Sequence, residues 1–181
     1  MSKKLKFFAM MLTCILLSIN QLWGVDYNLV TNISQLAAGD IVVIATSDGK
    51  TATTVENTNG KKNAYWYGYV ASTGSVASGK LTALGTNTAE YTLSKSGGYW
   101  VLTCSSGYVG SVSLAKLRYD TGTNTWEIAV NTTTYVATIS STDDGHGSIQ
   151  FANGDRFRTY TSSQTAVYLF KKETGSTKTL V

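Results

Sequence analysis

The chain has 181 residues, of which 43% are hydrophobic, 11% aromatic and only 14% charged. The aromatic content excludes a disordered tract, which cannot bury a core, and the absence of proline excludes collagen-like and proline-rich architectures. Thr and Ser, at 27 and 19 residues, provide the polar surface in place of charge, and with 17 Gly and 11 Tyr they favour strands and turns over a helical bundle.

The first 24 residues have the pattern of a signal peptide. Three lysines precede an apolar run, residues 7–19, and a polar stretch then ends at Gly24. The run has 13 residues, fewer than the roughly 20 that cross a bilayer as a helix, so we expect a removable leader and not a retained anchor. Lipidation at Cys14 is the alternative, which the preceding Thr13 disfavours. The sequence therefore predicts a protein that is secreted, periplasmic or on the outer cell surface.

Removal of the leader takes away most of the positive charge. The formal net charge of the chain is +4, but three of its 15 Lys and Arg and none of its 11 Asp and Glu lie in residues 1–24. The remaining net charge of about +1 gives no support to a nucleic-acid partner or to an anionic membrane surface. Cys104 becomes the one cysteine of the mature chain, so we expect stability to come from packing and not from a disulfide.

Residues 25–172 are predicted to form a single all-β domain. Residues 32–40 suit one helical turn, with Asn32 or Ser34 as its N-cap and Gly39 after its end. Short apolar or alternating runs, bounded by turn residues about every ten residues, then predict about 13 strands. These strands are expected at residues 40–45, 51–55, 64–70, 81–84, 90–94, 100–104, 108–112, 115–119, 126–130, 135–139, 149–152, 156–160 and 166–171. The polar residues 173–181 are predicted to be a flexible tail or the start of a linker.

A weak internal repeat indicates how the strands are arranged. A strand, a Gly or Asn turn and a returning strand recur from Asp40, Glu90 and Thr125, at intervals near the size of a β-trefoil lobe. We therefore expect a β-trefoil-like fold of about 12–13 short antiparallel strands. A sandwich or a barrel is the alternative, because counting turns does not determine how a sheet closes.

The densest aromatic segment, residues 64–70, is the first candidate binding site. Alternation along a strand places its three tyrosines on one face and its tryptophan on the other. An exposed aromatic plane can stack on a sugar ring, whereas the alternative is that these side chains brace neighbouring strands as part of the core. The candidate ligand contacts of this kind are Tyr65, Trp66, Tyr67, Tyr69 and Trp100.

Two arginines near the C-terminus form the second candidate. Arg156 and Arg158 share one face of a predicted strand with Tyr160, and two neighbouring guanidinium groups suit a carboxylate or a sulfate. The alternative is that they pair with acids such as Asp155, or that they cover a sheet edge.

The sequence contains few residues that could serve in catalysis or bind a metal ion. Its single histidine, His146, lies with Asp143 and Asp144 in residues 140–148, which lack the alternating oxygen ligands of an EF-hand-like loop and the further His or Cys that zinc needs. We therefore expect a solvated turn, no metal and no cofactor. A carboxylate pair for glycoside hydrolysis stays open, although no pattern selects one. The glutamates considered for it are Glu56, Glu90 and Glu127.

Three segments of the chain have a familiar pattern. They read VTNISQLAAGDIVVIA at 30–45, GYWVLTCSSGYVG at 98–110 and IQFANGDRFRTYTSSQTAVYLFKK at 149–172, the last with an Arg-Phe-Arg-x-Tyr segment and a Leu-Phe-Lys ending. In these segments the chain resembles an uncharacterised β-rich module of secreted, often multidomain proteins of Gram-negative gut-type bacteria. Such modules accompany extracellular nucleases, adhesin-like repeats and anchors, and the resemblance implies no catalytic residues.

Together these features predict an exported, non-catalytic module that binds a glycan or another surface polymer. The alternative is a structural or adhesin-type spacer domain with no small ligand, and a glycoside hydrolase-like enzyme is less favoured. A protein partner or a further C-terminal domain stays open, while no nucleic acid and no membrane span after removal of the leader are expected. Burial separates the first two functions, because aromatic side chains that share an exposed surface favour binding and fully packed ones favour a spacer.

Overall fold

The structure, a computed structural model, describes residues 25–57 and 66–174. The predicted leader and the predicted tail from residue 175 lie outside these residues. Tyr65 also lies outside them, and of Glu56 and Trp66 the backbone alone is described.

The described chain is all-β, as predicted, and it contains one short 3₁₀ helix, η1 (Ile33–Gln35). Each of the 13 predicted strands overlaps an observed one. The structure adds two strands of three residues, β1 and β5, which are too short to show alternation in a sequence. The strands are β1 (Tyr27–Leu29), β2 (Ile41–Ala45), β3 (Lys50–Asn57), β4 (Trp66–Ala71), β5 (Thr73–Ser75), β6 (Lys80–Ala83), β7 (Tyr91–Ser96), β8 (Tyr99–Cys104), β9 (Gly107–Ser113), β10 (Lys116–Tyr119), β11 (Trp126–Val130), β12 (Ala137–Ser141), β13 (Ser148–Ala152), β14 (Arg156–Tyr160) and β15 (Tyr168–Lys172).

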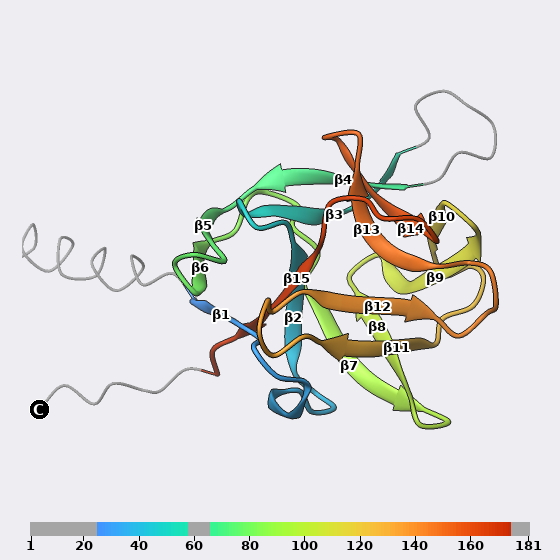
Figure 1. The fold of residues 1–181 in the computed structure, drawn as a ribbon, viewed down its shortest axis with the longest axis horizontal. Coiled ribbons are helices and arrows are strands. Elements are labelled where there is room, and N and C mark those ends of the chain that lie inside the picture. Colours follow the sequence, from blue (N-terminus) through green and yellow to red (C-terminus); the bar gives the residue numbers. More distant parts are fainter. Residues whose placement is uncertain (1–24, 58–65, 175–181) are drawn as a thin grey trace, which may run out of the picture.

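The antiparallel pairing of the strands closes into a circuit. From β8 the neighbours run through β11, β12, β13, β14, β4, β3 and β2, and β7 then pairs with both β2 and β8. Figure 1 shows β11 and β12 side by side across β7 and β8, with β1, β5 and β6 grouped at one side of the molecule. Each strand of this circuit therefore has a neighbour on both of its sides. The trefoil arrangement of these strands stays a prediction.

Strand β2 is buried on both of its faces. Val42 and Ile44 belong to the main core, which draws its side chains from the strands of the circuit. Val43 and Ala45 belong to a second cluster, which β1, β6 and β15 complete. A strand covered on both faces has a continuous apolar sequence. The prediction of a buried strand from the run at residues 40–45 is therefore confirmed.

Strands β1 and β15 bring the two ends of the described chain together. Tyr27 pairs with Lys172 and Leu29 with Phe170. Beyond the pair of Tyr27 and Lys172, the Glu173 amide donates to the Asp26 carbonyl at 2.8 Å. The chain therefore enters and leaves the sheet at one place.

The predicted helical turn is present as η1. Its N-cap is Asn32, whose side chain accepts a hydrogen bond from the Ser34 amide at 2.8 Å, while Gln35 Oε1 accepts one from the Asn32 amide at 3.0 Å. This reciprocal capping satisfies the amide groups that begin a helix. Gly39 follows with a φ of +94°, which a glycine adopts without strain. In the described part of the chain, no helix has the length and apolar character to span a membrane.

Candidate functional site

A hollow of about 430 Å³ opens between β8 and β11. Among the described residues, these strands pair at a single position, Trp100 with Trp126, and the hollow lies beside that pair. Its volume is within the usual range of small-ligand sites, roughly 300–1,000 Å³. The residues that line it are Lys95, Gly98, Tyr99, Trp100, Trp126, Glu127, Ile128, Ala129, Thr138 and Ser140.

A tight turn positions two of these side chains. Gly97 and Gly98 join β7 to β8 with φ values of +58° and +90°, and a two-residue hairpin turn with positive φ at both positions suits the twist of the sheet. The resulting register places Trp100 directly opposite Lys95 and Tyr99 opposite Ser96. The hairpin therefore carries an aromatic side chain and a cation to the hollow.

The aromatic residues of the hollow differ in exposure. Trp126 is fully buried, and its Nε1 donates to the Val109 carbonyl at 3.0 Å. Trp100 is 8% exposed and Tyr99 is 41% exposed. Lys95 Nζ lies 3.5 Å from the centre of the Trp100 ring. Tyr99 is thus the aromatic residue that the hollow presents to solvent.

Polar groups complete the lining on the side of β11 and β12. Glu127 and Thr138 are exposed, and Glu127 pairs in register with Ser140. The Ser140 hydroxyl exchanges a hydrogen bond of 2.7 Å with that of Ser148. A carboxylate, a cation and hydroxyl groups therefore surround an aromatic surface, a combination whose chemistry suits a polar ring-shaped ligand.

The predicted tyrosine platform divides between core and surface. Tyr67 is 2% exposed, and its ring stacks on Tyr119 of β10 with the ring centres 4.3 Å apart. Tyr69 is 41% exposed and makes an edge-to-face contact with Phe151 at 5.6 Å. Tyr67 thus braces β4 against β10, as the alternative interpretation expected, and has no surface to offer a ligand. The platform residues outside the described part are Tyr65 and the side chain of Trp66.

Tyr119 belongs to a buried network of tyrosine hydroxyls. It donates to the Thr53 carbonyl at 2.9 Å, and its oxygen lies 3.3 Å from the Tyr91 hydroxyl. Burial raises the pKa of both Tyr91 and Tyr119 above the usual value of a tyrosine. These two side chains are therefore neutral hydrogen-bonding groups of the core.

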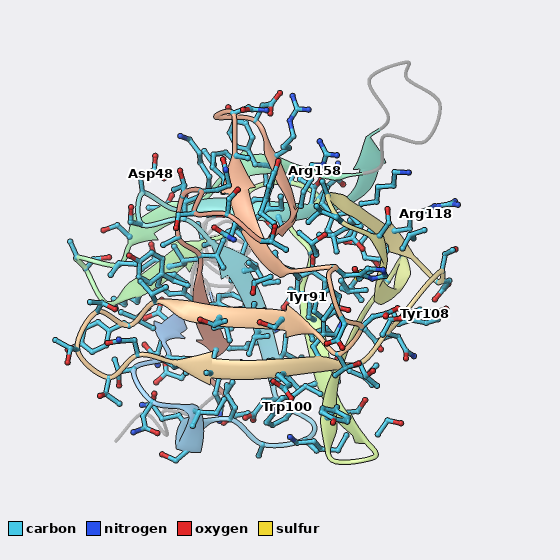
Figure 2. The ribbon with its side chains drawn as sticks, turned by 45° about the vertical axis from the view of Figure 1, so that its right-hand side comes forward. Asp48, Tyr91, Trp100, Tyr108, Arg118 and Arg158 are labelled. Carbon is cyan, nitrogen blue, oxygen red and sulfur yellow. The ribbon has the colours of Figure 1, made fainter. Side chains whose placement is uncertain are left out.

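The two predicted arginines make their contacts away from the hollow. Arg156 Nη2 donates to Asp155 Oδ2 at 2.7 Å, and this hydrogen bond holds the pKa of Asp155 below its usual range. Arg158 donates from Nε to the Ala115 carbonyl, and its guanidinium lies 6.0 Å from the Tyr160 ring. Figure 2 shows Arg158 and Trp100 at opposite ends of the molecule. The predicted aromatic and arginine contacts therefore do not form one site.

Sequence reasoning missed a set of polar contacts around His146. Its Nδ1 lies 3.0 Å from the Ser111 hydroxyl, within hydrogen-bond distance, whereas its Nε2 lies 3.7 Å from Asp143 Oδ2, beyond that distance. Asp143 Oδ2 accepts a hydrogen bond from the Thr123 hydroxyl at 3.0 Å. These residue types match a catalytic Ser-His-Asp set, but Ser111 is fully buried and its amide and carbonyl both bond to Thr123. The contact between His146 and Ser111 joins the loop at residues 140–148, which the sequence predicts to be a solvated turn, to β9. No sequence signal marks it, because Ser111 and His146 are 35 residues apart.

The glutamates considered for catalysis belong to different places. Glu127 lines the hollow, whereas Glu90 accepts hydrogen bonds from Lys172 Nζ at 2.8 Å and from the Tyr27 hydroxyl. Partial burial opposes ionisation of Glu90, but these two donors and the charge of Lys172 outweigh it and lower its pKa. Burial, followed by contact with Glu90, raises the pKa of Tyr27. Glu90 therefore acts as an ionised anchor for β1 and β15.

Comparison of the chain with models of known protein families and with curated protein sequences found no match. The resemblance of its sequence to a bacterial β-rich module therefore stays a prediction.

Proposed function

We propose that the protein is an exported, non-catalytic module that binds a glycan in the hollow between β8 and β11. The observation that carries the proposal is the exposure of Tyr99, 41%, at the opening of a hollow that also contains charged and hydroxyl side chains. The mature chain has a net charge of about +1, which favours a polymer with little charge over a polyanion.

The chemistry of a sugar ring matches this lining. The ring has an apolar C–H face, which gains from contact with the Tyr99 ring, and an edge of hydroxyl groups. Glu127 accepts hydrogen bonds from such hydroxyls, and Thr138 and Ser140 can donate or accept. Polar groups around one aromatic surface fix the orientation of a ligand and so provide specificity.

The lining favours binding without hydrolysis. Among the described residues that line the hollow, Glu127 is the one carboxylate. Hydrolysis of a glycosidic bond ordinarily uses two, set about 5–10 Å apart on either side of the bond. We therefore assign Glu127 to hydrogen bonding with the ligand.

A spacer domain is the second candidate. It is favoured by the burial of aromatic side chains that a binding platform would expose, because Tyr67 and Trp126 are almost wholly enclosed. In that case the hollow is an incidental feature of the surface, and the exposed Tyr99 has no ligand.

A glycan array separates these functions. The full chain, exported by its own leader and purified, is compared with Tyr99→Ala and with the matched control Tyr69→Ala, which removes a tyrosine of equal exposure from β4. We expect the parent to bind at least one neutral glycan, Tyr99→Ala to bind it about tenfold more weakly, and Tyr69→Ala to bind it normally. Loss in Tyr69→Ala would move the site to β4, and a parent that binds nothing would favour the spacer.

A further inference from the structure

We infer that Lys95 is a self-cap of the binding site: its ammonium group occupies the face of Trp100 on which a sugar ring stacks, and the ligand displaces it. The inference deepens the proposed function and rests on it. It makes Trp100, which is nearly buried in the free protein, a second contact for the ligand beside Tyr99.

The geometry of the pair supports this inference. Lys95 and Trp100 are direct cross-strand partners in the β7–β8 hairpin, and both line the hollow. Lys95 Nζ lies 3.5 Å from the centre of the Trp100 ring. Carbon atoms in van der Waals contact are about 3.5–4.0 Å apart, so a stacked sugar ring would need the space that the ammonium group fills. The two cannot occupy the same face of the ring together.

Displacement of Lys95 requires few contacts to be broken. Its side chain is exposed, and besides the ring it donates to the Gly98 carbonyl at 3.2 Å. It forms no ion pair with any described residue, in contrast to most other described lysines. Those that do form ion pairs are Lys50, Lys80, Lys171 and Lys172. The long flexible stem of Lys95 lets its charge move into water while the β7 backbone stays in place.

The position of the two aromatic residues also limits the ligand. Tyr99 and Trp100 are consecutive on β8, so their side chains leave the strand on opposite faces. One sugar ring therefore cannot stack on both. We assign the site to a neutral oligosaccharide of at least two rings, one on each aromatic residue.

The cap itself is tested in the free protein by acrylamide quenching of tryptophan fluorescence. Acrylamide is uncharged, so loss of a lysine charge does not change its local concentration. Lys95→Ala should increase quenching, whereas Lys116→Ala, which removes a lysine from β10, should not. The increase should disappear when Trp100→Phe is added to Lys95→Ala. Unchanged quenching in Lys95→Ala, with a parent-like melting temperature, would overturn the inference.

The role of the cap in binding is tested with neutral cello-, xylo- and manno-oligosaccharides, from monosaccharide to hexasaccharide. Lys95→Ala should bind the best of them about two- to fivefold more tightly than the parent, because the ligand no longer breaks a cation–π contact. Weaker binding would make Lys95 a ligand contact and overturn the cap. Equal affinity for monosaccharide and disaccharide would overturn the two-ring site. If no saccharide binds any variant, the proposed function fails, while the quenching result still decides whether Lys95 covers Trp100.

Discussion

Glu90 links the first and last strands of the domain through one carboxylate oxygen, so its ionisation state affects the stability of the fold. Its lowered pKa means that the ionised form is favoured in the folded state, and this stabilisation is present above the pKa of a glutamate in the unfolded chain. It is lost as the pH falls through the lowered pKa of the folded state.

We therefore predict that Glu90→Gln lowers the melting temperature at neutral pH by about 1–3 °C, as suits a partly exposed ion pair. The difference from the parent should shrink as the pH is lowered below about 4. Thermal unfolding followed across this pH range provides the measurement. Glu127→Gln is the matched control, since Glu127 is exposed and forms no ion pair with a described residue. A Glu90→Gln difference that persists unchanged in acid would contradict the assignment.

The exposure of single tyrosine side chains could not be predicted from the sequence. Alternation groups Tyr67 with Tyr69 on one side of β4, but it cannot tell that Tyr119, 52 positions further along the chain, covers Tyr67, while Tyr69 stays 41% exposed. Likewise, Tyr99 is not among the candidate contacts that the sequence indicates. Its exposure depends on the Gly97–Gly98 turn and on the single pair between β8 and β11, which are properties of the folded sheet.

At the scale of elements, the hairpin of β9 and β10 depends on a close approach between its backbone and the turn that follows. A Cβ atom at Gly110 would overlap the Thr121 carbonyl oxygen, although Gly110 does not have a positive φ. A side chain at this position must therefore push the backbone of residues 118–123 away from β9.

We predict that Gly110→Ala destabilises the domain by about 1–3 kcal/mol, measured by denaturant unfolding. Gly68→Ala is the control, since Gly68 is also a strand glycine with ordinary φ and its added Cβ would lie 3.4 Å from Thr53 Oγ1. That variant should be neutral or stabilising by up to about 1 kcal/mol, because alanine restricts the unfolded chain. Equal effects of the two substitutions would show that the close approach at Gly110 has no energetic cost.

The elements were largely predictable because their signals are local. The run at residues 40–45 and the turn glycines were sufficient to find β2 and most of the hairpins. The strand expected at residues 135–139 instead begins at Ala137, because Tyr135 has a φ of +61° and its amide closes the turn onto the Asn131 carbonyl at 2.7 Å. A tyrosine with positive φ is rare, so the pattern of apolar residues gave no warning of it.

At the scale of the whole molecule, we predict that the fold needs neither a metal ion nor a disulfide. Addition of a chelator or of a reductant to the full chain should leave its melting temperature unchanged to within about 1 °C. If a metal ion bound only the folded state, its removal by the chelator would lower that temperature. A drop of several degrees with a chelator would instead indicate a bound cation, and the loop of Asp143 and Asp144 would be the first place to examine. A drop with reductant alone would indicate a disulfide through Cys104.

The arrangement of the strands in the whole molecule was the feature least predictable from the sequence. The all-β class follows from composition and turn spacing, but closure depends on pairs such as Val42 with Tyr91, which are distant in sequence. The same holds for the hollow. Its lining comes from two hairpins, β7–β8 and β11–β12, and no local sequence pattern indicates that the two hairpins lie together.

The pairing of β1 with β15 has a mechanical consequence. A force that pulls residues 25 and 174 apart acts first on the hydrogen bond between Glu173 and Asp26. It then acts in turn on the strand pairs, from Tyr27 with Lys172 to Leu29 with Phe170. Hydrogen bonds between antiparallel strands lie across the strands, so this force opens them one after another and never shears them all at once. The sheet should thus unzip from its attachment point under low tension. A domain that opens in this way transmits little force between its two ends.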